Sequence, residues 1–206
     1  MLINVHTHQR KNDGIEILNS SEFDCSYFSY GIGPFELEEK IFEEHYLYHK
    51  NCLSIGEIGL DKLVQININK QINEFKNQLI YSEKLKLPVI IHCVKSFNEL
   101  IEIKRKLKPT QPWIIHGFRK TTLLENLLNE DFYISIGTAI LFDEKLQAII
   151  KKIPDNRIFL ETDNDENHSI QEVYLKIASL KEISLLDLEE IIFNNFKTVF
   201  TKWEIG

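Results

Sequence analysis

Short apolar runs alternate with amphipathic segments along this chain, and this alternation restricts its fold more than any other feature. The clearest run, Pro88-Val89-Ile90-Ile91, has no polar face, which predicts a strand buried on both sides, as in parallel sheets. Strands are expected at residues 1–8, 15–18, 23–31, 53–57, 88–92, 112–116, 132–136 and 157–163. Eight strands separated mostly by helices favour a closed (β/α)8 barrel over an open, doubly wound sheet.

The connecting segments support this barrel. Apolar periodicity and capping residues predict helices at 35–50, 72–85, 96–107 and 143–153, and three more beginning at Thr122, Ser169 and Ser184. Ser96 with Glu99, Thr122 with Glu125 and Ser169 with Glu172 have the spacing of capping boxes. Residues 9–14 are too few for a helix, so we expect a TIM-type barrel with a shortened first crossover. No repeat or linker interrupts residues 1–206, which predicts one domain.

Composition excludes several classes of protein. The chain has 31 acidic and 24 basic residues and a net charge of −7, whereas a stable nucleic-acid scaffold would normally be basic. Cys25, Cys52 and Cys93 are widely spaced and form no disulfide framework, which predicts reduced thiols and a cytoplasmic protein. No apolar run approaches the roughly 18 residues of a membrane span, so no membrane association is expected.

Six side chains that favour divalent transition metals stand at the ends of predicted strands: His6, His8, Glu57, His92, His116 and Asp163. Residues two apart on a strand point to the same side, so His6 and His8 form a pair. Each residue alone has a simpler explanation, such as a hydrogen-bonded core histidine, a helix-capping carboxylate or an aspartate that begins a turn. Because a (β/α)8 barrel has its active site at the C-terminal strand ends, all six together predict a metal centre.

Four imidazoles and two carboxylates suffice for two divalent ions, with magnesium, manganese or zinc as candidates. Glu57 has two oxygens and is the natural bridge. Two such metal ions lower the pKa of a bound water from about 15.7 toward neutrality. Asp163 could accept the proton of the attacking water. Lys62, Lys95 and Arg119 follow three of the strands and either meet substrate phosphates or are solvated loop charges; the sequence favours neither.

The strand-end segments resemble the ordered motifs of the TatD family, metal-dependent deoxyribonucleases among the amidohydrolase-like barrels. The resemblance is carried by Val5-His6-Thr7-His8, Gly56-Glu57-Ile58-Gly59-Leu60-Asp61, Pro88-Val89-Ile90-Ile91-His92, Ile115-His116-Gly117-Phe118 and Leu160-Glu161-Thr162-Asp163. Residues 191–200 are also similar to the closing helix of that family. The resemblance covers essentially the whole chain. It implies that the six residues above are the metal ligands and that the substrate is DNA, cleaved from its ends or as short single strands.

The chain departs from the family pattern at four places. Asn4 stands where the family has Asp, Gly33 replaces the His of Gly-x-His-Pro, and Lys95 replaces an Arg. Asn164-Asp165-Glu166 replaces Pro-Tyr after the last Asp, and these acids should repel a long polyanion. The resemblance therefore supports the metal ligands of this chain more strongly than it supports DNA as the substrate.

Three functions follow from these motifs. The first is hydrolysis of phosphodiesters by a water activated between two metal ions. The second is hydrolysis of a small phosphoester or amide at the same ions, because one barrel supports many chemistries. The third is a barrel that binds metal or a protein partner without catalysis, which the intact ligand set argues against.

Overall fold

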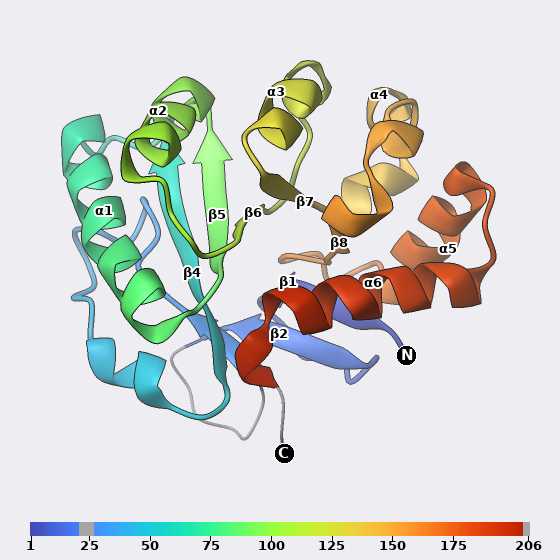
Figure 1. Ribbon diagram of the computed structural model, residues 1–206, viewed down its shortest axis with the longest axis horizontal. Helices are drawn as coiled ribbons and strands as arrows, with labels where there is room; N and C mark the ends of the chain where they lie inside the picture. The colour runs from blue at the N-terminus through green and yellow to red at the C-terminus, as the bar shows by residue number, and fades with distance from the viewer. Residues whose placement is uncertain (21–26, 204–206) are drawn as a thin grey trace.

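Eight parallel strands follow one another around the sheet in the computed structural model, which describes residues 1–20 and 27–203 (Figure 1). They are β1 (Ile3–Thr7), β2 (Ile15–Asn19), β3 (Tyr27–Tyr30), β4 (Cys52–Asp61), β5 (Val89–Val94), β6 (Trp113–Ile115), β7 (Phe132–Ile136) and β8 (Ile158–Leu160). Each strand pairs with its sequence neighbours, and the barrel predicted from the sequence is confirmed in nearly closed form. Part of the strand predicted at 23–31 lies outside the described residues.

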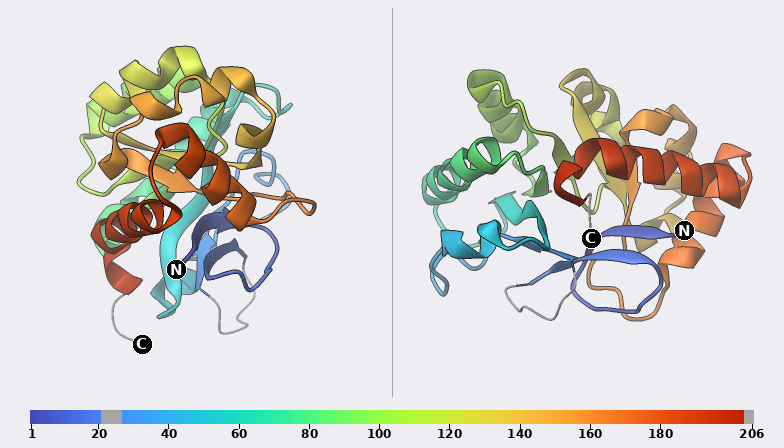
Figure 2. Two further views of the ribbon diagram at one scale, coloured as in Figure 1. Left: turned by 90° about the vertical axis from the view of Figure 1, so that its right-hand side faces the viewer. Right: turned by 60° about the horizontal axis from the view of Figure 1, so that its bottom comes forward.

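Helices lie on the outside of the strands (Figure 2). The α-helices are α1 (Ile68–Leu85), α2 (Phe97–Leu107), α3 (Leu124–Asn129), α4 (Glu144–Gln147), α5 (Ile170–Lys181) and α6 (Leu185–Val199). Short 3-10 helices connect them: η1 (Glu44–Tyr48), η2 (Thr121–Leu123), η3 (Thr138–Leu141), η4 (Ile150–Lys152), η5 (Asp155–Arg157) and η6 (Thr201–Trp203). The shortened first crossover is confirmed, since residues 8–14 between β1 and β2 contain no helix.

The helix predicted at 35–50 is wrong. This segment forms turns followed by the short η1, and Ile41, expected on its buried face, is 84% exposed. Periodicity alone does not sustain a helix in water, because most helical stability comes from an apolar face packed against a partner. Tyr46 and Phe42 stack instead on Tyr30 of β3, with ring centroids 4.5 and 5.6 Å away.

The predicted capping boxes are only partly formed. Ser169 and Glu172 cap α5 reciprocally, as predicted. Ser96 directly precedes α2 but forms no side-chain cap, and the Glu99 carboxylate pairs with Lys62. The helix expected at Thr122 begins two residues later, after the 3-10 turn η2, and the helix predicted at 143–153 is interrupted after Gln147. The capping motifs therefore located the starts of α2 and α5, and the start of α3 only to within two residues.

The barrel closes through a narrow contact between β1 and the chain just after β8. Two backbone bonds make this closure: His8 N–H donates to the Asp163 carbonyl at 2.9 Å, and Asp163 N–H donates to the His6 carbonyl at 3.0 Å. Helix α6 packs against both β1 and β8 (Figure 1). The residues that close the barrel are thus three of the predicted metal ligands.

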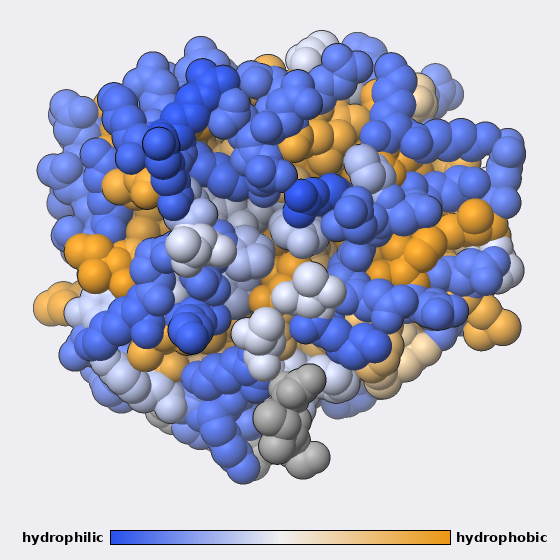
Figure 3. All heavy atoms as spheres, viewed as in Figure 1, coloured by the Kyte–Doolittle hydropathy of each residue, from blue (hydrophilic) through white to orange (hydrophobic). Residues whose placement is uncertain are grey.

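The core of the molecule is largely apolar, and the outer surface is mixed. Large side chains such as Trp113, Phe132 and Phe159 are fully buried. On the face in Figure 3, hydrophobic residues form separate groups among hydrophilic ones. Within residues 1–20 and 27–203, no helix is long and apolar enough to cross a membrane.

Gly59 lets β4 approach β5 closely beside a predicted ligand. Its φ is +152°, and an added Cβ would overlap the carbonyl of His92. We expect Gly59→Ala to lower the free energy of unfolding by about 2–4 kcal/mol, because strained backbone and overlap act together. The measurement is urea-induced unfolding. Gly137→Ala is the control, since its Cβ would make only ordinary contacts with Glu161; equal stability of the two variants would contradict the interpretation.

Candidate metal centre

All six predicted ligand side chains lie together at the C-terminal end of the barrel. Strand β1 carries His6 and is followed by His8, β4 carries Glu57 and β5 carries His92. His116 follows β6, and Asp163 lies three residues beyond β8. Three overlapping groups of these residues have ligand atoms within 4.8 Å of one another: His6 with His8 and Glu57, His6 with His116 and Asp163, and Glu57 with His92 and His116. Strand ends scattered over the sequence thus meet in one cluster.

Glu57 stands between two sets of histidines. Its Oε1 lies 2.7 Å from His92 Nδ1 and 2.9 Å from His116 Nε2. Its Oε2 lies 3.7 Å from the Nε2 atoms of both His6 and His8. Each carboxylate oxygen therefore faces its own pair of imidazoles, which is the arrangement that a bridging ligand requires.

Asp163 completes the first set. Its Oδ1 lies 3.4 Å from Nε2 of both His6 and His8. His6 is fully buried, and neither of its ring nitrogens has a hydrogen-bond partner within the described part of the chain. A buried imidazole without a partner is costly unless a ligand satisfies it, so the residues present fit a divalent cation.

The local charges also suit cations. Burial opposes ionisation of Glu57, but His116 and the other imidazoles hold the pKa of its carboxyl well below the usual range. Burial likewise opposes ionisation of Asp163, whereas the adjacent imidazoles of His6 and His8 lower its pKa. In return, Asp163 and Glu57 raise the pKa of His8 to about 9. Both carboxylates are therefore anionic at neutral pH and can act as metal ligands.

Two further carboxylates lie behind the ligands. Asp61 Oδ2 lies 3.1 Å from His92 Nε2, which turns Nδ1 toward Glu57. Glu161 Oε1 lies 3.6 Å from Nδ1 of His116, and Glu161 itself accepts hydrogen bonds from the Gly117 N–H and the Ser135 hydroxyl. Asp61 was not among the predicted site residues, although Asp61 and Glu57 are four residues apart on one strand and therefore share a face. Partners of this kind fix the ring orientation of metal-binding histidines.

The three predicted phosphate contacts differ in their surroundings. Lys62 pairs with Glu99, and Arg119 lies 3.5 Å from Asp143. Lys95 is exposed at the N-terminus of α2 and has no ion pair with another described residue. Of the three, Arg119 lines the cavity beside Asp163, and Lys95 is the one without an ion pair among the described residues.

The departures from the family pattern have structural counterparts. Asn4 points across the barrel closure and hydrogen-bonds to Thr162 in both directions. Gly33 lies beside the Glu57 carbonyl and under the ring of Phe35, whose edge packs 5.3 Å from His92. An aromatic ring therefore lines this part of the mouth, where the family has a histidine.

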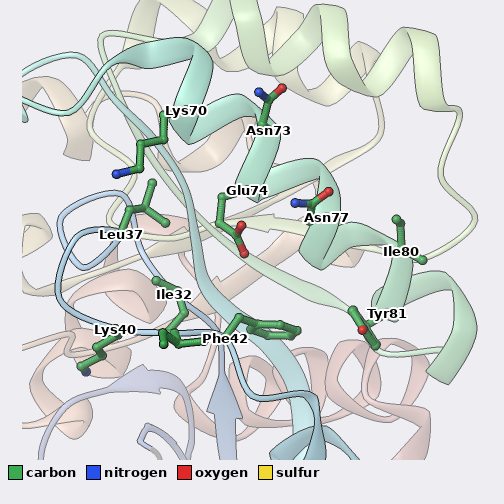
Figure 4. A pocket seen from close by; sticks show the side chains of 11 residues that line it. Ile32, Leu37, Lys40, Phe42, Lys70, Asn73, Glu74, Asn77, Ile80 and Tyr81 are labelled. Atoms are coloured by element: carbon green, nitrogen blue, oxygen red, sulfur yellow. The ribbon is translucent and has the colours of Figure 1, made fainter.

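Cavities flank the centre on two sides. One of about 470 Å³ adjoins His8, and one of about 440 Å³ adjoins Asp163. A larger cavity of about 860 Å³ lies between α1 and residues 32–42 (Figure 4), where Glu74 and Phe42 face one another across it. None of the six predicted ligands lines this larger cavity, so its size does not make it the reactive site.

Comparisons with known proteins agree with this geometry. The chain is 26% identical to the uncharacterized metal-dependent hydrolase YabD of Bacillus subtilis, over 87% of this chain and 79% of YabD. It is 32% identical to the human 3′-5′ RNA nuclease TATDN2 over 57% of this chain and 16% of that protein. The crystal structure of YjjV, a TatD homologue from Escherichia coli K12, superposes with a TM-score of 0.71 at 22% identity, covering 85% of this chain and 77% of YjjV. The profile of the family described as TatD related DNase matches residues 1–201, and the chain therefore belongs to that family of metal-dependent hydrolases.

Proposed function

We propose that the protein hydrolyses phosphodiester bonds, with DNA ends or short single-stranded DNA as substrates, at a centre of two divalent ions. The observation that carries this proposal is the position of Glu57, whose two carboxylate oxygens face separate pairs of imidazoles. His6, His8 and Asp163 would hold one ion, and His92 and His116 the other. The family description and the nuclease activity named for the human relative support a nucleic-acid substrate.

Divalent ions at such a centre make a nearby water more acidic and stabilise the charge that develops on a phosphoryl group. The side chains of the chain would do the rest. Asp163, which is ionised and 36% exposed at its side chain, takes the proton of the attacking water. Lys95 orients a substrate phosphate from the N-terminus of α2. Asp61 keeps His92 aimed at Glu57.

The charges around the centre favour short substrates. The cavity beside His8 is lined by Glu36, Glu39 and Glu43, with Lys40 as its cation. The cavity beside Asp163 is lined by four acids and by Arg119. A long polyanion that extended into either cavity would meet carboxylates, which repel it. This pattern also favours the second candidate function, hydrolysis of a small phosphoester or amide at the same centre.

Asp163→Asn tests the proton acceptor. We expect the variant to keep its fold and much of its metal, and to lose about 10²–10⁴-fold in turnover of bis(p-nitrophenyl) phosphate, because an amide cannot take the proton. The measurement is the initial rate at saturating metal. Asp13→Asn makes the same change at an exposed carboxylate and serves as the control. A rate like that of the wild type in Asp163→Asn would exclude its role as base.

Glu57→Gln tests the bridge. An amide has one oxygen acceptor and no charge, so it cannot serve two cations. We expect occupancy of both ions to fall together, measured by elemental analysis after dialysis against a fixed metal concentration. Circular dichroism establishes that the variant is folded. Loss of one ion with full retention of the other would show that Glu57 is not shared.

Glu39→Lys tests the effect of the acidic cavity on substrate length. Glu39 is exposed beside the centre, so reversing its charge should increase cleavage of single-stranded DNA several-fold at low salt. The gain should fade as salt screens the interaction, and hydrolysis of bis(p-nitrophenyl) phosphate should not change. Glu125→Lys makes the same change on α3, outside both cavities. Equal effects of the two variants on DNA cleavage would contradict a local role for the acidic cavity.

A further inference from the structure

A chain of buried hydrogen bonds runs across the barrel closure and ends beside the metal centre. Asn4 Nδ2 donates to Thr162 Oγ1 at 2.8 Å, and Thr162 Oγ1 lies 3.2 Å from Thr7 Oγ1. Thr7 Oγ1 in turn donates to the carbonyl of Gln9 at 2.8 Å. Asn4, Thr7 and Thr162 are each at most 2% exposed, so water does not compete for these bonds. We call these four residues the closure relay.

Backbone groups at both ends fix the direction of the relay. The Thr162 N–H can only donate, and it donates to Asn4 Oδ1 at 3.1 Å, so the other end of the amide must be the donor to Thr162 Oγ1. At the far end, the Gln9 carbonyl can only accept, which uses the Thr7 proton. Thr162 must therefore donate to Thr7. Every proton in the relay has one position.

The residues of the closure relay alternate along the sequence with one set of predicted ligands. His6 lies between Asn4 and Thr7, His8 follows Thr7, and Asp163 follows Thr162. The same backbone segments carry the two bonds that join His6 and His8 to Asp163. His92 and His116, by contrast, belong to β5 and the end of β6, which pair through the regular register from Val89 to Ile91. The relay therefore supports the ligands of one ion and not those of the other.

We infer that Asn4 is a positioning residue, which holds His6, His8 and Asp163 in place through the closure relay. This inference rests on the proposed centre of two ions. It also gives a physical reason for an amide at position 4. A carboxylate there has no proton to donate, so Thr162 would turn its own proton to residue 4, and the contact between Thr162 and Thr7 would lose its hydrogen.

Charge and geometry predict opposite effects for Asn4→Asp. A new negative charge near the centre would tighten cation binding if electrostatic attraction dominated. Disruption of the relay would loosen it, because displaced outer partners of metal ligands cost about 10–100-fold in metal affinity. The sign of the change in affinity therefore separates the two explanations.

The experiment is a titration of metal-free protein with zinc, which resolves the affinity of each ion by calorimetry. We expect Thr162→Val and Asn4→Asp to bind one ion about 10–100-fold more weakly and the other with the affinity of the wild type. Thr162→Ser keeps the hydroxyl and should restore the first ion. Ser54→Ala removes another buried hydroxyl, one without a hydrogen-bond partner among the described residues, and should leave both affinities unchanged.

The possible outcomes separate the relay from the proposed function. Wild-type protein that binds fewer than two ions contradicts the two-ion centre. If the wild type binds two, tighter or unchanged binding in Asn4→Asp overturns the relay, as does equal weakening of both ions. Thermal unfolding identifies any variant that does not fold. If Thr162→Val does not fold, the direction of the change in metal affinity in Asn4→Asp tests the relay by itself.

Discussion

Glu57 is the residue on which the rest of this structure depends. A carboxylate that is 4% exposed would be unstable without compensation, and four imidazoles from three separate strand regions supply it. His6 and His8 also contact Asp163, which lies beyond β8 at the opposite end of the strand order, so the sheet must complete a full turn to bring them together. The sheet therefore has to close for the buried charge of Glu57 and the other ligands to be balanced.

The strand ends were predictable because two simple rules act together there. Parallel strands end on one side of a barrel, and a polar residue after an apolar run must meet a partner there. The cluster of His6, Glu57 and His92 follows from those rules. The helix predicted at 35–50 was wrong because periodicity does not show whether a partner surface exists. Ile41, expected on the buried face of that helix, is exposed. Asp61 was missed because the predicted strand ended at Glu57, whereas β4 continues to Asp61 and carries it to His92.

The number of acids around the centre changes its expected electrostatics. The sequence indicated two anionic ligands, Glu57 and Asp163. Asp61 and Glu161 lie beside His92 and His116, so four carboxylates would equal the charge of two divalent ions in the proposed centre. Such a centre would attract a polyanion only weakly from a distance. Substrate choice would then depend on the surrounding loops, which are acidic beside β3 and β8.

The connections around the barrel differ in how much helical structure they contain. From β4 onward, α-helices follow the strands, whereas residues 8–14 after β1 and 31–51 after β3 form turns and the short η1. A connection that packs few of its own side chains can change in length or sequence without disturbing the sheet. In evolutionary terms, this wall is the part of the barrel that can change by insertion or substitution without moving the strands that carry the imidazoles.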